Sequence, residues 1–346
     1  MSEQLRVGVV GAGRMGADHV RRLHERISGA RPVAVADPDL DAAKRAADGV
    51  AGCRAEQDPA AVIGASDVDA VVLVTPGATH EELLLACVER GVPVLCEKPL
   101  TPDSSAALRV VRAEVARGRQ LIQVGFMRRF DAEHAELKRL LDAEELGRAL
   151  VLHCAHRNAA APPEFTDAMM IFDSVVHEID TARWLLGEEI TAVSARRAPA
   201  TRNAPAGLHD PQLVSLETAS GVLVEVEIFV HAQFGYQVRC EAVCESGTAT
   251  AGGDAGLLRN TAGRWGGSVA ADFRDRFQPA FDAEFQRWVR AAARGGIDGA
   301  SAWDGYAAAA VCEAGVSAQT GGRTAVDLAA RPDLYTPPDL DTGEEQ

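Results

Sequence analysis

The sequence predicts an α/β domain built on a parallel sheet, followed by an α+β domain with an open, mostly antiparallel sheet. Short apolar runs alternate with helical patterns up to about residue 126, strand-like runs then follow one another, and 346 residues suffice for two domains. We therefore expect a first domain at 1–126, a second at 127–335, and an acidic tail at 336–346 that frays.

The first domain is expected to contain strands at 5–10, 32–37, 68–74, 92–98 and 119–126. Between them we expect helices at 14–27, 39–47, 80–91 and 103–117. The strands are apolar along nearly their whole length, which is typical of a parallel sheet covered by helices on both faces.

The second domain is expected to contain strands at 149–157, 190–198, 212–219, 222–231 and 236–245. Helices are expected at 131–142, 171–186, 274–294 and 303–319. Ser220 and Gly221 separate two alternating apolar runs, which indicates a hairpin and hence antiparallel pairing. One face of this sheet should carry helices, and the other must be covered, because an exposed apolar sheet face is a liability.

Composition excludes several classes of protein. The net charge is -15, and no basic cluster with interleaved aromatics is present, so we expect no nucleic-acid partner. No apolar run approaches the roughly 18 residues that span a bilayer, and the N-terminus lacks a signal-peptide pattern, so we expect no membrane partner and a cytoplasmic protein. The seven cysteines show no CxxC spacing, which favours free thiols over a metal site or disulfides.

The chain begins with a glycine pattern that carries a physical meaning. Gly11, Gly13 and Gly16 form G-x-G-x-x-G directly after the first strand and at the start of a helix. In such a turn the first glycine permits the tight bend, the second lets the backbone approach a pyrophosphate, and the third lets helix and strand pack closely. The pattern predicts a Rossmann dinucleotide site, with Arg14 and Met15 also at the cofactor.

Asp37 ends the second strand, 21 residues after Gly16. A carboxylate there accepts hydrogen bonds from the ribose hydroxyls and repels a 2′-phosphate, so we expect NAD rather than NADP. The alternative is that Asp37 only caps the helix that starts at 39.

Lys98 lies in Cys96-Glu97-Lys98-Pro99, at the carboxyl end of a predicted strand. Ligands of open α/β sheets bind just outside such ends. Only three of the 35 basic residues are lysines, and an ammonium, unlike a guanidinium, can change its protonation state when partly buried. A surface lysine on a loop is the alternative.

Asp173 and His177 are spaced i, i+4 on a predicted helix, and Asp180 follows three residues later. Such spacing places a carboxylate beside an imidazole, which raises its basicity and suits a general base for alcohol oxidation. A neutral imidazole is required for this role, so activity should rise towards alkaline pH. The alternative is an exposed ion pair on an amphipathic helix.

Together, GAGRMG, CEKP and D-x-x-x-H-x-x-D resemble the glucose-fructose oxidoreductase/inositol dehydrogenase (Gfo/Idh/MocA) family. Further segments are similar to the bacterial inositol 2-dehydrogenase members of that family, at 125–131, 153–158, 173–185, 209–218, 234–241 and 302–309. The resemblance covers nearly the whole chain.

The resemblance implies an NAD-dependent oxidation of a secondary hydroxyl of a cyclic polyol, myo-inositol to 2-keto-inositol. The implied catalytic set is Lys98, Asp173 and His177, in which His177 is the base, Lys98 holds the reacting oxygen and Asp173 orients the histidine. The implied substrate-binding residues are Arg128, His156, Asn158 and Tyr236.

The same resemblance implies cofactor contacts from Thr75, His80 and Glu97, besides Lys98. It also implies a cis peptide bond between Lys98 and Pro99, and a homo-oligomer, a tetramer, formed through the open face of the second sheet. The loop 75–80 is one residue shorter than the corresponding family loop and lacks its tryptophan, and 160–164 replaces a polar loop near the substrate.

Three alternative functions stay open at this point. The first is a dehydrogenase for another cyclitol or sugar, and the second is an NAD-dependent glycosidase of the same family. The third is a non-catalytic NAD sensor, against which the lysine, aspartate and histidine set argues. Net NADH production separates the dehydrogenase from the glycosidase.

Overall fold

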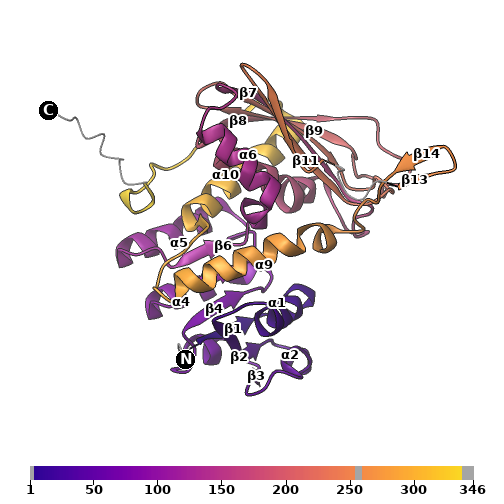
Figure 1. Ribbon diagram of the computed structural model, residues 1–346. Coiled ribbons are helices and arrows are strands. Elements are labelled where there is room, and N and C mark those ends of the chain that lie inside the picture. The colour runs from indigo at the N-terminus through magenta and orange to yellow at the C-terminus, as the bar shows by residue number, and fades with distance from the viewer. Residues whose placement is uncertain (1–3, 254–258, 337–346) are drawn as a thin grey trace.

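The computed structural model describes residues 4–253 and 259–336, which form two seven-stranded sheets with helices between and around them (Figure 1). The predicted tail therefore lies almost wholly outside the described residues. The predicted fold class is confirmed, since the first sheet is parallel except at one edge and the second is mostly antiparallel.

The first sheet has the strand order β15-β6-β5-β4-β1-β2-β3. Its strands are β1 (Leu5–Val10), β2 (Ala30–Ala36), β3 (Arg54–Glu56), β4 (Ala70–Leu73), β5 (Val94–Cys96), β6 (Ile122–Val124) and β15 (Ala300–Ser301). Its helices are α1 (Arg14–Glu25), α2 (Leu40–Ala47), α3 (Pro59–Ile63), α4 (His80–Arg90) and α5 (Ser104–Arg117). β1 and β4 are buried almost throughout, as the apolar runs predict. Helix α4 ends at Gly91, whose left-handed φ of 81° lets its N–H bond back to Cys87 and Val88.

The second sheet has the order β12-β11-β7-β10-β9-β8-β16. Its strands are β7 (Ala149–Arg157), β8 (Ile190–Arg197), β9 (Gln212–Thr218), β10 (Leu223–Phe229), β11 (Gln237–Cys244), β12 (Thr248–Ala251) and β16 (Thr324–Ala325). The β9–β10 hairpin turns where Ser220 and Gly221 predict it, while β10 pairs with β7 in parallel. A short separate hairpin joins β13 (Arg259–Thr261) and β14 (Arg264–Gly266).

Helices of the second half lie between the two sheets. They are α6 (Ala132–Asp142), α7 (Asp167–Met169), α8 (Val176–Leu186), α9 (Phe273–Ala292) and α10 (Ala302–Gly321), with a π-helical turn at Met170–Val175 before α8. Figure 1 shows α9 lying along the first sheet, where Phe285, Trp288 and Val289 enter that sheet's core. β15 pairs with β6, so the C-terminal part of the chain returns to the first domain, which the sequence does not predict.

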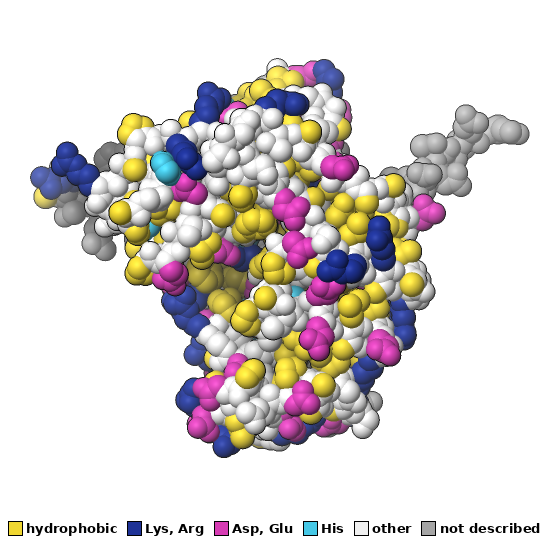
Figure 2. All heavy atoms as spheres, turned by 180° about the vertical axis from the view of Figure 1, so that it is seen from behind, with side chains coloured by type: hydrophobic (Ala, Val, Ile, Leu, Met, Phe, Trp, Pro, Cys, Tyr) yellow, Lys and Arg dark blue, Asp and Glu magenta, His cyan; other side chains and the backbone are white. Residues whose placement is uncertain are grey.

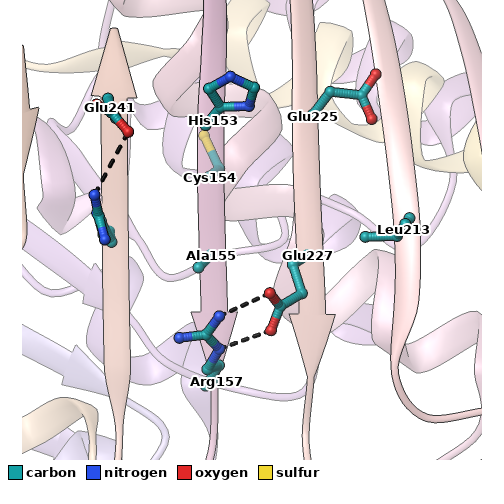
Figure 3. A pocket seen from close by; sticks show the side chains of 9 residues that line it. His153, Cys154, Ala155, Arg157, Leu213, Glu225, Glu227 and Glu241 are labelled. Carbon is teal, nitrogen blue, oxygen red and sulfur yellow. Dashed lines mark hydrogen bonds and ion pairs between the residues drawn. The ribbon is translucent and has the colours of Figure 1, made fainter. Parts of the chain in front are cut away.

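The outer face of the second sheet, opposite to the one from which His156 enters the cleft, projects mixed side chains towards the viewer in Figure 3. Arg157 on β7 forms an ion pair with Glu227 on β10 at 2.7 Å, and Leu213 on β9 is 47% exposed. Leu223, on β10, is also exposed. This face combines exposed leucines with charged pairs.

All seven cysteines are free thiols, and six of them are buried. Within residues 4–253 and 259–336, no helix has the length and apolar character needed to cross a membrane.

Candidate active site in the interdomain cleft

A cleft of about 680 Å³ lies between the two sheets. On the face seen in Figure 2 the surface is hollowed between the upper and lower parts of the molecule. The glycine turn and the loops after β4, β5 and β6 contribute one wall, and β7 and the π-helical turn contribute the other. The cleft is thus at the carboxyl ends of parallel strands, where ligands of such sheets bind.

The structure brings ten of the predicted site residues to the lining of this cleft. They are Arg14, Met15, Thr75, Glu97, Lys98, His156, Asn158, Asp173, His177 and Tyr236. Four predicted positions, Gly11, Gly13, Gly16 and Asp37, belong to the glycine turn and the strand end beside it. The remaining two, His80 and Arg128, lie behind the lining.

Each of the three positions in the turn requires glycine for a different physical reason. Gly11 has φ of +102°, and a Cβ there would lie 2.6 Å from the Val74 carbonyl oxygen. A Cβ on Gly16 would overlap the Gly11 carbonyl, so only glycine lets α1 pack this closely on the turn. A Cβ on Gly13 would meet no protein atom within 4 Å. Gly13 therefore borders open space at the start of α1, where a helix N-terminus favours an anion.

Asp37 holds the glycine turn from the end of β2. Its Oδ2 accepts a hydrogen bond from the Ala12 N–H at 2.7 Å, and its Oδ1 accepts one from the Asp39 N–H at 2.9 Å. The cap of α2 is Asp39 itself, which accepts from the Asp41 N–H. Asp37 is thus not the helix cap, and its carboxylate lies beside the glycine turn.

These observations fit a bound NAD. Gly13 leaves room for close approach, α1 begins without a side-chain cap on its N–H groups, and the Asp37 carboxylate is at hand for ribose hydroxyls. Lys98 reaches into the same cleft from the loop after β5, and the Lys98-Pro99 peptide bond is cis, as expected.

Lys98 and Asp173 meet across the cleft. The lysine Nζ donates to the main-chain oxygen of Asp173 at 3.1 Å and lies 4.0 Å from its Oδ1. Glu97 turns the other way, and its Oε1 bonds Nε2 of buried His19 at 2.7 Å. Burial opposes ionisation of Glu97, but the hydrogen bond to His19 and the charges of His19 and Lys98 leave its pKa lowered. A negative group therefore remains beside Lys98.

His177 is 8% exposed and lines the cleft. Its Nδ1 is sealed from solvent and has no hydrogen-bond partner. Burial, and then the positive charges of Arg128 and Lys98, hold the pKa of His177 well below its usual value. The imidazole is therefore neutral at neutral pH, as a general base must be. Since Nδ1 is sealed, Nε2 is the nitrogen that can take a proton from a hydroxyl in the cleft.

The expected contact between Asp173 and His177 is not formed, which corrects the i, i+4 interpretation. Residues 170–175 form a π-helical turn, so Asp173 and His177 do not have the spacing of a regular α-helix. Asp173 faces Lys98 instead. Asp180 is also not a partner of His177, because it is buried against Arg129, with which it forms hydrogen bonds of 2.6 and 3.0 Å.

Arg128 and His80 correct two further expectations. Arg128 is 2% exposed and forms a buried ion pair with Glu178, so it supports the cleft wall from behind. His80 is 1% exposed, and its ring nitrogens lie 2.8 Å from the carbonyl oxygens of Thr75 and Pro99. His80 therefore joins the loop after β4 to the turn that carries Lys98.

Sequence reasoning missed several residues of the cleft. Phe165, Ser174, Asp272, Phe273 and Phe281 also line it. The aromatic ones come from the 160–165 loop and from α9, whose return to the first domain has no signal in the local pattern.

Comparison with known proteins agrees with this geometry. Residues 5–126 match a family model described as "Oxidoreductase family, NAD-binding Rossmann fold", and residues 134–250 match one described as "GFO/IDH/MocA C-terminal domain". The chain is 71% identical to inositol 2-dehydrogenase 4 of Saccharopolyspora erythraea over 96% of this chain and 99% of the relative. It is 55% identical to the inositol 2-dehydrogenase of Pseudarthrobacter chlorophenolicus over 97% and 100%.

A solved structure is similar over nearly the same length. The myo-inositol dehydrogenase of Lactobacillus casei, in complex with NAD(H) and myo-inositol, aligns with a TM-score of 0.92 and 32% identity. The alignment covers 96% of this chain and 100% of that one.

Proposed function

This chain belongs to the GFO/IDH/MocA family of NAD-binding oxidoreductases, and from that membership we propose that it is an inositol 2-dehydrogenase, which oxidises myo-inositol to 2-keto-inositol with NAD⁺. The observation that carries the proposal is the meeting of Lys98, Asp173 and His177 in one cleft beside the glycine turn. The names of the relatives supply the substrate class.

The residues of the cleft divide the chemistry between them. Nε2 of His177 takes the proton of the reacting hydroxyl, because burial keeps this imidazole neutral. The Lys98 ammonium donates a hydrogen bond to the same oxygen and stabilises the negative charge that develops on it. Asp173 holds Lys98 in position through its main-chain oxygen and its carboxylate. Bound NAD⁺ supplies the hydride acceptor.

The cofactor would be held by the glycine turn and by the loops that follow β4 and β5. Gly11, Gly13 and Gly16 shape the phosphate site, Arg14 and Met15 border it, and Asp37 takes the ribose hydroxyls. Thr75 and Glu97 border the cleft further along. His80 supports this end indirectly, since it positions the Thr75 loop.

The polyol would lie against His156, Asn158 and Tyr236, which line the same cleft as Lys98. Several donors and acceptors at fixed angles suit a ring of hydroxyls. Arg128 supports this wall from behind through its ion pair with Glu178 and its hydrogen bond with Tyr236.

A direct assay tests the proposed function. Purified protein is mixed with NAD⁺ and a panel of cyclitols and sugars, and NADH absorbance is followed. We expect myo-inositol to be oxidised faster than glucose at equal concentration. Reaction of aldose sugars alone would contradict the substrate assignment, and glycoside cleavage without net NADH would favour the glycosidase.

We also propose a cytoplasmic homotetramer. The outer face of the second sheet exposes Leu213 and Leu223, and a second copy of the chain would cover it. Light scattering on the purified protein measures the assembly. A variant with Leu213→Glu, which places a charge on this face, should dissociate, and an unchanged tetramer would show that another surface is used.

A further inference from the structure

Glu178, Arg128 and His156 are three buried side chains in mutual contact at one wall of the cleft, and Glu178 has no part in the reaction described above. Glu178 on α8 is 2% exposed and forms an ion pair with Arg128, while its Oε2 lies 3.1 Å from Nδ1 of His156. His156 reaches the cleft from β7, so Glu178 touches the substrate wall only through this histidine.

Nδ1 of His156 lies within hydrogen-bond distance of two groups, one of which only accepts and the other only donates. It lies 3.1 Å from Oε2 of Glu178, which can only accept, and 3.2 Å from Nη2 of Arg128, which can only donate. In a neutral imidazole, Nδ1 either carries the proton or has the lone pair. The partner that hydrogen-bonds to Nδ1 therefore decides whether Nε2, the other ring nitrogen, is an acceptor or a donor.

The environment of each competitor decides in favour of Glu178. Burial opposes ionisation of this carboxyl, but the charge of Arg128 and the contact with His156 bring its pKa down to about 2. It is thus a buried carboxylate, and an oxygen of such a group without a donor is costly. Arg128 has another partner, since it also forms a side-chain hydrogen bond with Tyr236.

This arrangement gives the wall a defined polarity. With Nδ1–H bonded to Glu178, Nε2 of His156 has its lone pair free. The Tyr236 oxygen accepts from Arg128, so its own O–H proton is available as a donor. The two rings are 5.8 Å apart between centroids, and both line the cleft. An acceptor and a donor side by side match neighbouring hydroxyls of a polyol.

We propose that Glu178 is a positioning residue that fixes His156 as the Nδ1–H tautomer, so that the cleft presents an acceptor at Nε2 beside the Tyr236 hydroxyl donor. The proposal rests on the proposed function for its substrate, and it adds a selection rule. The group that faces His156 must donate a proton, as a hydroxyl does and a fluorine or an ether oxygen does not.

Histidine labelled with ¹⁵N tests the tautomer directly, without any turnover. The signals of His156 are identified by their loss in His156→Gln. We expect a protonated Nδ1 and an unprotonated Nε2 in the wild-type protein at neutral pH. A protonated Nε2 would overturn the proposal. This readout does not depend on which sugar or cyclitol reacts, so it stays valid if the proposed function fails.

Kinetics of wild-type protein test the selection rule. In a series of inositols with one hydroxyl replaced by fluorine or by hydrogen, we expect one position, away from the reacting carbon, where fluorine raises KM as much as hydrogen does. The assignment is wrong if, at every position where hydrogen raises KM, fluorine leaves KM within about twofold of the value for inositol. In that case Nε2 donates a hydrogen bond.

The variant Glu178→Gln tests the role of the carboxylate. We expect KM for myo-inositol to rise at least ~10-fold, with kcat and KM for NAD⁺ changed less than about twofold, the pattern of lost substrate binding. The control Glu136→Gln removes an exposed carboxylate on α6 and should change nothing. The positioning role is refuted if Glu178→Gln folds and keeps its KM for inositol. It is also refuted if the variant loses both kcat and NAD⁺ binding. If the variant does not fold, the two measurements on the wild-type protein decide.

Discussion

Nζ of Lys98 lies 3.1 Å from the main-chain oxygen of Asp173 and 4.0 Å from its carboxylate. The lysine comes from the first domain and the aspartate from the second, so the pair closes the cleft at the point where the reacting oxygen would lie. A main-chain oxygen is a fixed acceptor, and it leaves the ammonium two further N–H donors. The pair therefore holds a compact cation in place without using up its hydrogen bonds.

Replacing Lys98 by Arg keeps the charge and changes the shape. A guanidinium is a planar fork that cannot occupy the place of an ammonium within one hydrogen bond of both Asp173 and the substrate. We expect kcat to fall at least ~10²-fold with little change in NAD⁺ affinity, because the lost interaction is made chiefly in the transition state. Steady-state kinetics and calorimetry on the same protein measure both quantities.

The matched control for this variant is Lys138→Arg, which makes the same change in α6, where the lysine pairs with Asp142. It should leave kcat unaltered. Near-wild-type turnover by Lys98→Arg would show that position 98 supplies charge alone.

His177→Ala removes the proton acceptor. A lost general base typically lowers the rate by ~10²–10⁴-fold. We expect kcat to fall by this amount while the variant still folds and binds NAD⁺. The exposed His24 in α1 provides the control, since His24→Ala should retain full activity. A loss below tenfold would assign the proton to another group.

The pH profile tests the state of the same histidine. Its pKa is lowered by burial and by the charges of Arg128 and Lys98, and the neutral form is the active one. Activity should therefore be lost only as the pH falls below the ordinary histidine value of 6.5, instead of still rising through neutral pH as an exposed histidine would make it. An acid limb of kcat/KM with its midpoint above 6.5 would contradict this environment.

Gly13 and Gly16 give a pair of variants with opposite expectations. Gly16→Ala would overlap the Gly11 carbonyl, so we expect a loss of stability of about 1–3 kcal/mol, measured by thermal unfolding. Gly13→Ala meets no protein atom within 4 Å, so stability should fall by less than ~1 kcal/mol. NAD⁺ affinity should nevertheless fall for Gly13→Ala, because its methyl group occupies the space left for the phosphates. Unaltered binding by Gly13→Ala would place the phosphates elsewhere.

The sequence predicts those structural features that depend on residues close together in the chain. The alternation of apolar runs and helices, the glycine turn and the Ser220–Gly221 hairpin are set by neighbours in the chain, and the structure has them where predicted. The partner of Asp173 could not be predicted, because a π-helical turn at Met170–Val175 replaces the α-helical spacing on which the expectation was based.

Other features depend on residues far apart in sequence. The burial of Arg128 by Glu178, 50 residues away, turns an expected substrate contact into a support behind the wall. The return of α9 to the first sheet likewise depends on Phe285 and Trp288, which pack into a core formed by residues 5–95 of the chain. The place of His80 could not be predicted for the same reason, since this buried side chain joins its own loop to the Pro99 carbonyl 19 residues later.

Asp37 should decide between NAD⁺ and NADP⁺. Its carboxylate is held by the N–H groups of Ala12 and Asp39, so it cannot swing away from a 2′-phosphate placed at the end of β2. Like charges brought together at a binding site cost several kcal/mol, so we expect the wild-type kcat/KM to favour NAD⁺ at least ~10²-fold. Equal efficiency with the two cofactors would refute this and point to Lys44 or Arg45 at the phosphate.

The variant Asp37→Asn removes the charge and keeps the size. Its amide oxygen can still accept from the Ala12 N–H, so the glycine turn should keep its shape, while the Asp39 N–H at the surface turns to water for its acceptor. The NAD⁺ to NADP⁺ preference should narrow at least ~10-fold, since the repulsion and the strongest ribose acceptor are both lost. Asp39→Asn is the matched control two residues away, because asparagine also caps α2 well. If both variants narrowed the preference equally, the discrimination would come from the general negative potential of this turn, and the specific role of Asp37 would have to be abandoned.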